Sequence, residues 1–182
     1  MQFTLVSTIF NEARRLPQTI ADLEAQTVQP TEIIITDAGS TDGTWELLEA
    51  WQKRNQVPIV LLRENRCNVA RGRNLAIAAA KTELIVSTDF GCRFHAQWLE
   101  SLVFPFEQDD KTQVVGGNYG VDYQELKTDI AKAAYVLNNG YRNFNDANFL
   151  PSSRSIAYKK TIWKSIGGYN EALTLAGDDT LF

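Results

Sequence analysis

The chain has 182 residues, of which 44% are hydrophobic and 22% are charged, and it carries a formal net charge of −4. These values are typical of one globular domain and exclude disordered, fibrous and low-complexity proteins. The acidic balance also argues against binding to nucleic acid or to an anionic membrane through basic side chains.

The cysteine content and the lengths of the apolar runs indicate the cellular compartment. Cys67 and Cys92 are too few for a disulfide framework or a zinc site, so we interpret them as reduced packing residues. No apolar run approaches the roughly 18–20 residues that cross a bilayer, and residues 1–10 lack the features of a signal peptide. We therefore expect a cytoplasmic protein with no transmembrane segment in this chain.

The first half of the chain alternates between apolar strands and amphipathic helices. The sequence predicts strands at 3–10, 32–36, 59–63 and 84–88, and helices within 11–25, 44–55 and 70–80. Strands that alternate with helices are typical of a parallel sheet covered on both faces. We therefore expect an α/β fold with a mostly parallel central sheet and helices on both faces.

The second half is less regular. The sequence predicts helices at 97–106, 129–139 and 160–166, strands at 113–121 and 155–158, and a further helix at the last residues. No linker, Pro-rich or Ser-rich hinge, or repeat separates the two halves. We therefore expect a single domain over residues 1–182.

Polar residues follow three of the predicted strands, at the points where ligands bind in open parallel sheets. They are Thr8 with the pair Asn11-Glu12, Asp37 with the turn Gly39-Ser40-Thr41-Asp42-Gly43, and Asp89. Together they predict one crevice. Each also has a simpler interpretation, because Asp37, Ser40 and Asp42 are ordinary turn and helix-capping residues.

Six segments together resemble the inverting glycosyltransferases of family 2, which have the GT-A fold. They are Val-Ser-Thr-Ile-Phe-Asn-Glu at 6–12, Thr-Asp-Ala-Gly-Ser-Thr-Asp-Gly-Thr at 36–44, Arg-Gly-Arg-Asn at 71–74, Thr88-Asp89, Gly-Gly-Tyr-Asn-Glu at 167–171 and Gly-Asp-Asp at 177–179. The resemblance covers essentially the whole chain and implies a nucleotide-binding half at 1–95 and an acceptor-side half at 96–182.

The resemblance implies contacts to the nucleotide of a sugar donor, and we expect this donor to be a UDP-sugar. Thr8 and Asp37 take the positions that contact the base, and Arg73, or failing it Arg71, takes that of an arginine that approaches the nucleotide. Asn11, Glu12, Gly39 and Ser40 belong to the same loops. For the two arginines, a solvated helix face is the alternative interpretation.

Asp89 matches the first aspartate of the family's Asp-x-Asp motif, which supports Mg²⁺ or Mn²⁺ bound to the two phosphates. The sequence departs from the pattern at Gly91, which replaces the second aspartate. The resemblance therefore implies a metal site of which Asp89 is one ligand. His95 is either a replacement ligand or a packed or surface residue.

Asp178 and Asp179 match the family's Glu-Asp pair, whose second residue removes the proton from the acceptor hydroxyl. The resemblance makes Asp179 the general base of an inverting transfer to a carbohydrate or lipid-linked acceptor, and a like charge on Asp178 raises one carboxyl pKa. The alternative is that both residues cap a helix that begins near Thr180.

Family members usually continue well past this pair, so we expect the chain to be truncated at its C-terminus and the longer form to lie in the cytoplasm or at the inner face of a membrane. The alternative function is a nucleotide-binding or interaction domain without catalysis. Another α/β nucleotide enzyme is disfavoured, because neither a Gly-x-Gly-x-x-Gly turn nor a Gly-x-x-x-x-Gly-Lys-Ser/Thr loop is present.

Overall fold

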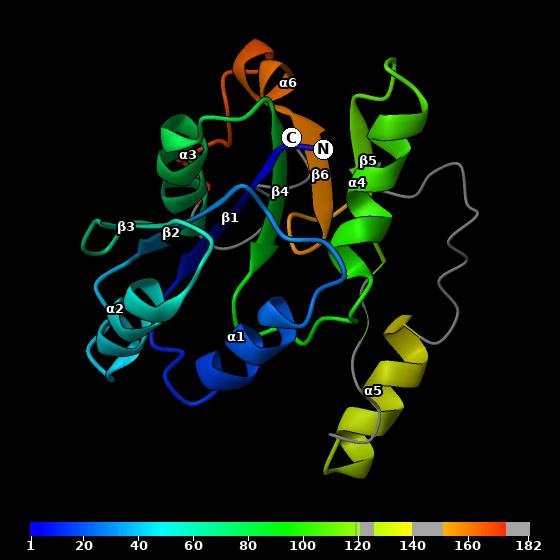
Figure 1. Cartoon of the computed structure of the whole chain (residues 1–182). Coiled ribbons are helices and arrows are strands. Elements are labelled where there is room, and N and C mark those ends of the chain that lie inside the picture. Colours follow the sequence, from blue (N-terminus) through cyan, green and yellow to red (C-terminus); the bar gives the residue numbers. More distant parts are fainter. Residues whose placement is uncertain (119, 121–125, 140–150, 174–182) are drawn as a thin grey trace.

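The computed structural model describes residues 1–118, 120, 126–139 and 151–173 (Figure 1). Its centre is a six-stranded sheet with the strand order β3-β2-β1-β4-β6-β5. The elements follow in chain order: β1 (Phe3–Ile9), α1 (Leu16–Glu24), β2 (Glu32–Asp37), α2 (Thr44–Arg54), β3 (Ile59–Arg63), α3 (Val69–Ala79), β4 (Leu84–Asp89), α4 (Trp98–Gln108), β5 (Val114–Gly116), α5 (Asp129–Asn139), β6 (Ile156–Lys159) and α6 (Lys160–Ser165).

The first four strands form a parallel block, in which β1 lies between β2 and β4. All six residues of β2 are buried, as expected for an apolar strand covered on both faces. The register places Thr8 of β1 opposite Thr36 on one side and opposite Asp89 on the other. The polar residues at the ends of these three strands therefore meet at one edge of the sheet.

The last two strands extend the sheet beyond β4 through antiparallel pairing. β6 runs antiparallel to β4, and β5 runs antiparallel to β6. Because β6 runs toward the opposite edge, the residues that precede it lie beside the carboxyl end of β4. Residues from the second half of the chain therefore reach the edge at which β1, β2 and β4 end.

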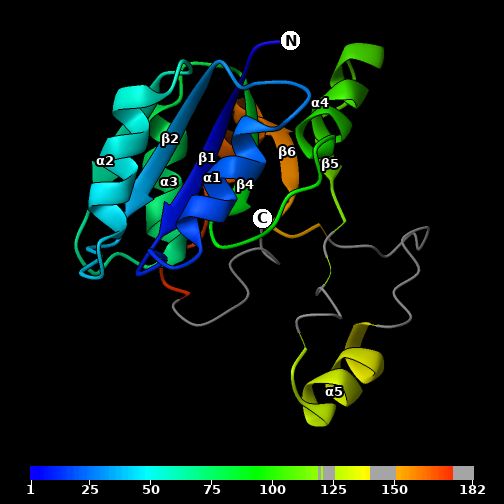
Figure 2. The same cartoon turned by 60° about the horizontal axis from the view of Figure 1, so that its bottom comes forward.

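Helices cover both faces of the sheet. One apolar cluster joins α1, α2 and α4 through Leu16, Trp51 and Leu99, while the other joins α3 to the opposite face through Ala76 and Ile77. Figure 2 shows α1 and α2 on one side of the sheet and α3 on the other, with α5 apart from it. The predicted α/β fold with a mostly parallel sheet is confirmed.

α1 lies within the predicted helical stretch 11–25 and begins at Leu16, because Asn11 has a left-handed φ of 53° and the amides of Glu12 and Ala13 bind the side chains of Thr44 and Asp42. The strand predicted at 113–121 differs from the observed one. β5 ends at Gly116 instead of continuing to 121, in keeping with the low strand propensity of two successive glycines.

The predicted helix at the last residues, including Asp178 and Asp179, lies outside the described residues. Within the described ranges, no helix has the length and apolar character needed to span a membrane.

Candidate active site

Thr8 marks the centre of the polar edge. Its side chain is half-buried, and Gly72 of α3 packs directly against it. A Cβ atom added at Gly72 would lie 2.6 Å from Cγ2 of Thr8. The glycine in the Arg-Gly-Arg-Asn segment therefore allows α3 to approach the end of β1 and to form one wall of the site.

The loops after β1 and β2 are joined by side chain to backbone hydrogen bonds. These are Asn11 N to Ser40 Oγ (2.8 Å), Thr41 N to Asn11 Oδ1 (2.9 Å), Glu12 N to Thr44 Oγ1 (2.9 Å) and Ala13 N to Asp42 Oδ2 (3.0 Å). A hydrogen bond from the Thr44 hydroxyl lowers the pKa of Asp42. Ser40 and Asp42 thus hold the two loops together, and the predicted residues Asn11, Glu12 and Ser40 are brought into one unit.

Asp37 lies beneath this pair of loops, and its side chain has no exposed surface. Its carboxylate accepts hydrogen bonds from Ser40 N (3.1 and 3.2 Å) and from Arg63 Nε (2.8 Å). The Arg63 guanidinium in turn stacks over Trp45, 4.2 Å from the ring centroid. A direct contact between Asp37 and a base therefore requires Arg63 to move, whereas support of the turn does not.

Gly39 fits the same turn for a steric reason. Its φ is 94°, and a Cβ atom there would lie 2.7 Å from Oδ1 of Asn65. Only glycine combines this backbone conformation with so close a neighbour. Gly39 therefore shapes the turn and brings its backbone next to the loop after β3.

Asp89 lies between two arginines. Its Oδ1 is 2.5 Å from Nη2 of Arg73, and its Oδ2 is 3.5 Å from Nε of Arg154. The Arg73 side chain is only 2% exposed and lies over the Tyr169 ring, whereas that of Arg154 is 55% exposed. Arg73 is therefore a buried partner of Asp89, and Arg154 is a largely exposed cation at this edge.

The sequence analysis did not identify Arg154. Its backbone carbonyl accepts a hydrogen bond from the Thr88 hydroxyl (2.8 Å), which fixes its position beside the end of β4. The signal in the sequence was an arginine just before a predicted strand, but its place depends on the antiparallel pairing of β6 with β4. That pairing joins segments far apart in the chain, and local patterns do not specify it.

Gly91 and Glu12 lie in contact. Gly91 has a φ of 92°, and a Cβ atom there would lie 2.8 and 3.1 Å from the two carboxylate oxygens of Glu12. His95 is exposed, and its Nδ1 accepts a hydrogen bond from Gln97 N (3.4 Å). Among the described residues, no group of three or more His, Cys, Asp and Glu side chains is arranged to hold a metal ion.

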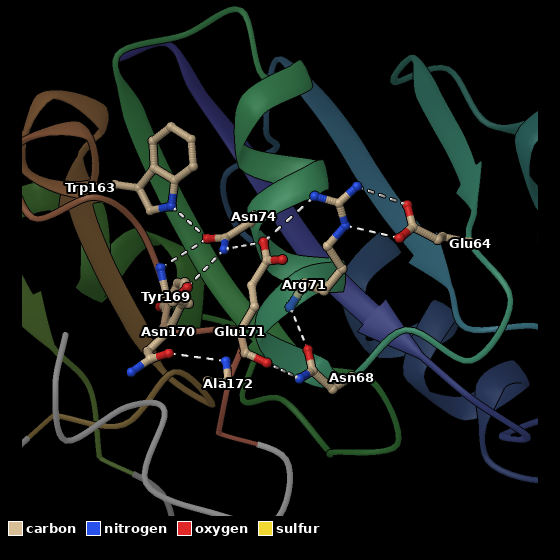
Figure 3. A network of polar contacts seen from close by, with 9 residues as sticks. All are labelled: Glu64, Asn68, Arg71, Asn74, Trp163, Tyr169, Asn170, Glu171 and Ala172. Atoms are coloured by element: carbon tan, nitrogen blue, oxygen red, sulfur yellow. Dashed lines mark hydrogen bonds and ion pairs between the residues drawn. The ribbon is translucent and has the colours of Figure 1, made fainter.

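Arg71 lies on the outer face of α3, away from Asp89, where it forms ion pairs. Nε and Nη2 of Arg71 donate to the Glu64 carboxylate (2.9 and 3.2 Å), and Nη1 lies 3.7 Å from Glu171. Figure 3 shows Arg71 between these two acidic residues. The structure thus separates the two candidate arginines, because Arg73 faces the sheet edge and Arg71 links α3 to the segment after α6.

Asn74 of α3 is the centre of that link. Its Nδ2 donates to Tyr169 O (2.9 Å) and to Glu171 Oε1 (2.8 Å), and its Oδ1 accepts from Tyr169 N and from Trp163 Nε1 (both 2.9 Å). Asn68 Nδ2 adds a bond to Glu171 O (2.7 Å), as Figure 3 shows. We call this set of contacts the α3 clasp. It holds the chain in place as far as Leu173, which precedes the predicted pair Asp178-Asp179 in the sequence.

Comparisons with known proteins found similar sequences. Residues 4–164 match Glycosyl transferase family 2. The chain is 30% identical over 119 residues to the glycosyltransferase GlyG of Streptococcus pneumoniae, which covers 65% of this chain and 40% of GlyG. It is 20% identical over 177 residues to the glycosyltransferase AglE of Haloferax volcanii, covering 96% of this chain and 58% of AglE.

Two solved structures show the same fold. TarS 1–349 of S. aureus in complex with UDP-GlcNAc has a TM-score of 0.75 and 17% identity, and the match covers 100% of this chain and 52% of that one. The mannosyltransferase PcManGT of Pyrobaculum calidifontis, in complex with GDP-Man and Mn²⁺, has a TM-score of 0.72 and 18% identity, covering 99% and 50%. This chain thus spans about half of each of these proteins.

Proposed function

Because this chain belongs to glycosyl transferase family 2, we propose that it binds a nucleotide sugar at the edge where β1, β2 and β4 end and transfers the sugar to an acceptor hydroxyl. The observation that carries the proposal is the juxtaposition of Thr8, Asp89 and the exposed Arg154 at that edge. This edge offers polar groups for a nucleoside beside a cation for a diphosphate, as ligand sites of parallel sheets commonly do.

The nucleotide-binding half, 1–95, supplies the nucleoside contacts. Thr8 and the turn around Gly39 and Ser40 are proposed to face the base, with UDP as the preferred nucleotide. Asp37 supports this turn from below through Ser40 N and Arg63. Complexes of TarS with UDP-GlcNAc and of PcManGT with GDP-Man support a nucleotide sugar as the donor.

The diphosphate is proposed to lie beside Arg154, whose planar guanidinium suits phosphate oxygens. Arg73 holds the Asp89 carboxylate in place from the buried side. Arg71 contributes indirectly, because its ion pair with Glu171 adds to the attachment that the α3 clasp makes to the same segment. Mg²⁺ or Mn²⁺ is proposed as the cofactor, supplying Lewis-acid neutralisation of charge on the departing diphosphate.

The acceptor-side half, 96–182, is proposed to carry the general base. Asp179 takes the proton from a hydroxyl of a carbohydrate or lipid-linked acceptor. The like charge on Asp178 raises one of the two carboxyl pKa values. One base suffices for transfer with inversion, because the hydroxyl attacks in a single displacement. The α3 clasp supports this role, since it fixes the backbone of the segment that leads to the pair.

Calorimetric titration of the chain with UDP, GDP and ADP tests the donor site, and Arg154→Gln tests its cation. We expect UDP to bind most tightly and the variant to lose about tenfold or more in affinity, as is usual when a charge-assisted contact is removed. Arg54→Gln is the matched control, because Arg54 is an exposed α2 residue paired with Glu24. Absence of nucleotide binding would refute the proposal, and binding without sugar transfer would favour a nucleotide-binding domain.

A further inference from the structure

Glu12 occupies the space that a side chain at position 91 would fill. Gly91 follows Asp89 by two positions, where the family motif has its second aspartate, and its φ of 92° favours glycine. A Cβ atom built on Gly91 would lie 2.8 Å from Oε2, 3.0 Å from Cδ and 3.1 Å from Oε1 of Glu12. A carboxylate is therefore present at this point of the site, but it comes from the loop after β1.

The Glu12 backbone is held firmly, and its carboxylate is available. Its amide donates to Thr44 Oγ1 (2.9 Å), and its carbonyl accepts from Arg15 N (3.0 Å) and Leu16 N (2.9 Å). Within the described part of the chain, no hydrogen bond or ion pair engages the Glu12 carboxylate. Asp89, in contrast, has each carboxylate oxygen beside an arginine.

Cys92 lies near both acidic side chains. Burial raises the pKa of the Cys92 thiol, and the negative charge of Asp89 raises it further, with an additional contribution from Glu12. Arg154 and Arg15 act in the opposite direction. Glu12 and Asp89 therefore both lie within electrostatic range of Cys92, while the contact with Gly91 is made by Glu12.

We propose that Glu12 supplies the carboxylate that Gly91 removes from the Asp-x-Asp motif, and that Glu12 binds the divalent cation together with the diphosphate of the donor. Mg²⁺ and Mn²⁺ prefer oxygen ligands, and a site of one or two carboxylates plus phosphate oxygens is sufficient for such ions. This inference rests on the proposed function. In this arrangement Asp89 has a second role, because its ion pair with Arg154 holds that guanidinium beside the diphosphate.

The test is calorimetric titration of UDP into the chain, with and without Mn²⁺, combined with paramagnetic resonance of free Mn²⁺. For the unaltered chain we expect Mn²⁺ to increase UDP affinity. For Glu12→Gln we expect a loss of about tenfold or more in the gain from Mn²⁺, measured as the ratio of the UDP affinities with and without the metal. Glu46→Gln, at an exposed position on α2, should keep the whole gain.

A double variant tests whether a carboxylate at position 91 can replace the carboxylate of Glu12. Glu12→Ala vacates the space beside residue 91, and Gly91→Asp then places a carboxylate there, since Asp tolerates positive φ better than most residues. We expect the double variant to recover much of the gain that Glu12→Ala alone loses. Recovery also shows that the fold tolerates the Glu12→Ala substitution in the double variant.

Three results would overturn the inference. If Glu12→Gln keeps the whole gain from Mn²⁺, the cation lies elsewhere. If the unaltered chain binds UDP equally well with and without Mn²⁺, Glu12 has no metal role, although the proposed function stands. If the unaltered chain binds no nucleotide at all, the proposed function fails, and the inference fails with it.

Discussion

Replacing Asn74 by alanine should detach the segment after α6 from α3. Asn74 forms four hydrogen bonds in the α3 clasp, with lengths of 2.8 to 2.9 Å. At about 0.5–1.5 kcal/mol each they would sum to about 2–6 kcal/mol. Water can replace the bond to the exposed Glu171 carboxylate, so we expect Asn74→Ala to lower the free energy of unfolding by about 2–4 kcal/mol.

The assay combines urea denaturation with amide hydrogen exchange. Exchange at the Tyr169 amide, which donates to Asn74 Oδ1, should accelerate in the variant because that bond is lost. Asn55→Ala is the control, since Asn55 Nδ2 forms one side-chain hydrogen bond, to Val57 O, and should cost only about 0.5–1.5 kcal/mol. An Asn74→Ala chain as stable as the control, with an unchanged Tyr169 amide, would refute the role assigned to the clasp.

Three further predictions concern the carboxylates. If Asp37 supports the turn through Arg63, Asp37→Ala should lower the melting temperature and weaken the binding of UDP, GDP and ADP to the same extent. A loss of affinity for UDP alone, measured by calorimetry, would show instead that Asp37 contacts the base directly. Asp179→Asn should leave nucleotide affinity nearly unchanged while slowing sugar transfer by about 10²–10⁴-fold; loss of UDP binding would contradict this role. Since the Thr44 hydroxyl lowers the folded-state pKa of Asp42 below the ordinary value of 3.8, the stabilisation is present above that pH and lost as the pH falls through the folded pKa. Acid denaturation curves of the unaltered chain and Asp42→Asn should therefore converge at low pH, and parallel curves would contradict the prediction.

The sequence predicted the parallel block well because its signals are local. β2 has three successive isoleucines at its centre and is followed by a turn with two glycines, which identifies a buried strand without reference to the rest of the chain. The end of each such strand lies at the same edge of a parallel sheet. The meeting of Thr8 with Asp89 therefore followed from the pattern, and the register confirms it.

The partners of the charged residues were not predictable in the same way. Arg73 was expected to approach a nucleotide, and the sequence did not reveal that it would be buried against Asp89 or that Arg63 would pair with Asp37. Arg154 reaches the site only because β6 is antiparallel to β4. Long side chains can satisfy a carboxylate from several positions, and which one does so depends on tertiary packing that a single sequence does not reveal. The roles of Asp178 and Asp179 remain predictions.

The α3 clasp recognises mostly peptide groups. Asn74 binds the amide and the carbonyl of Tyr169, and Asn68 binds the carbonyls of Glu171 and Leu173. Every amino acid offers the same carbonyl, so this attachment depends little on the identity of the side chains in the segment. An engineer who wishes to graft another segment onto this scaffold should therefore preserve Asn68, Asn74, the backbone path and the buried Tyr169, and can vary the exposed side chains of the segment itself.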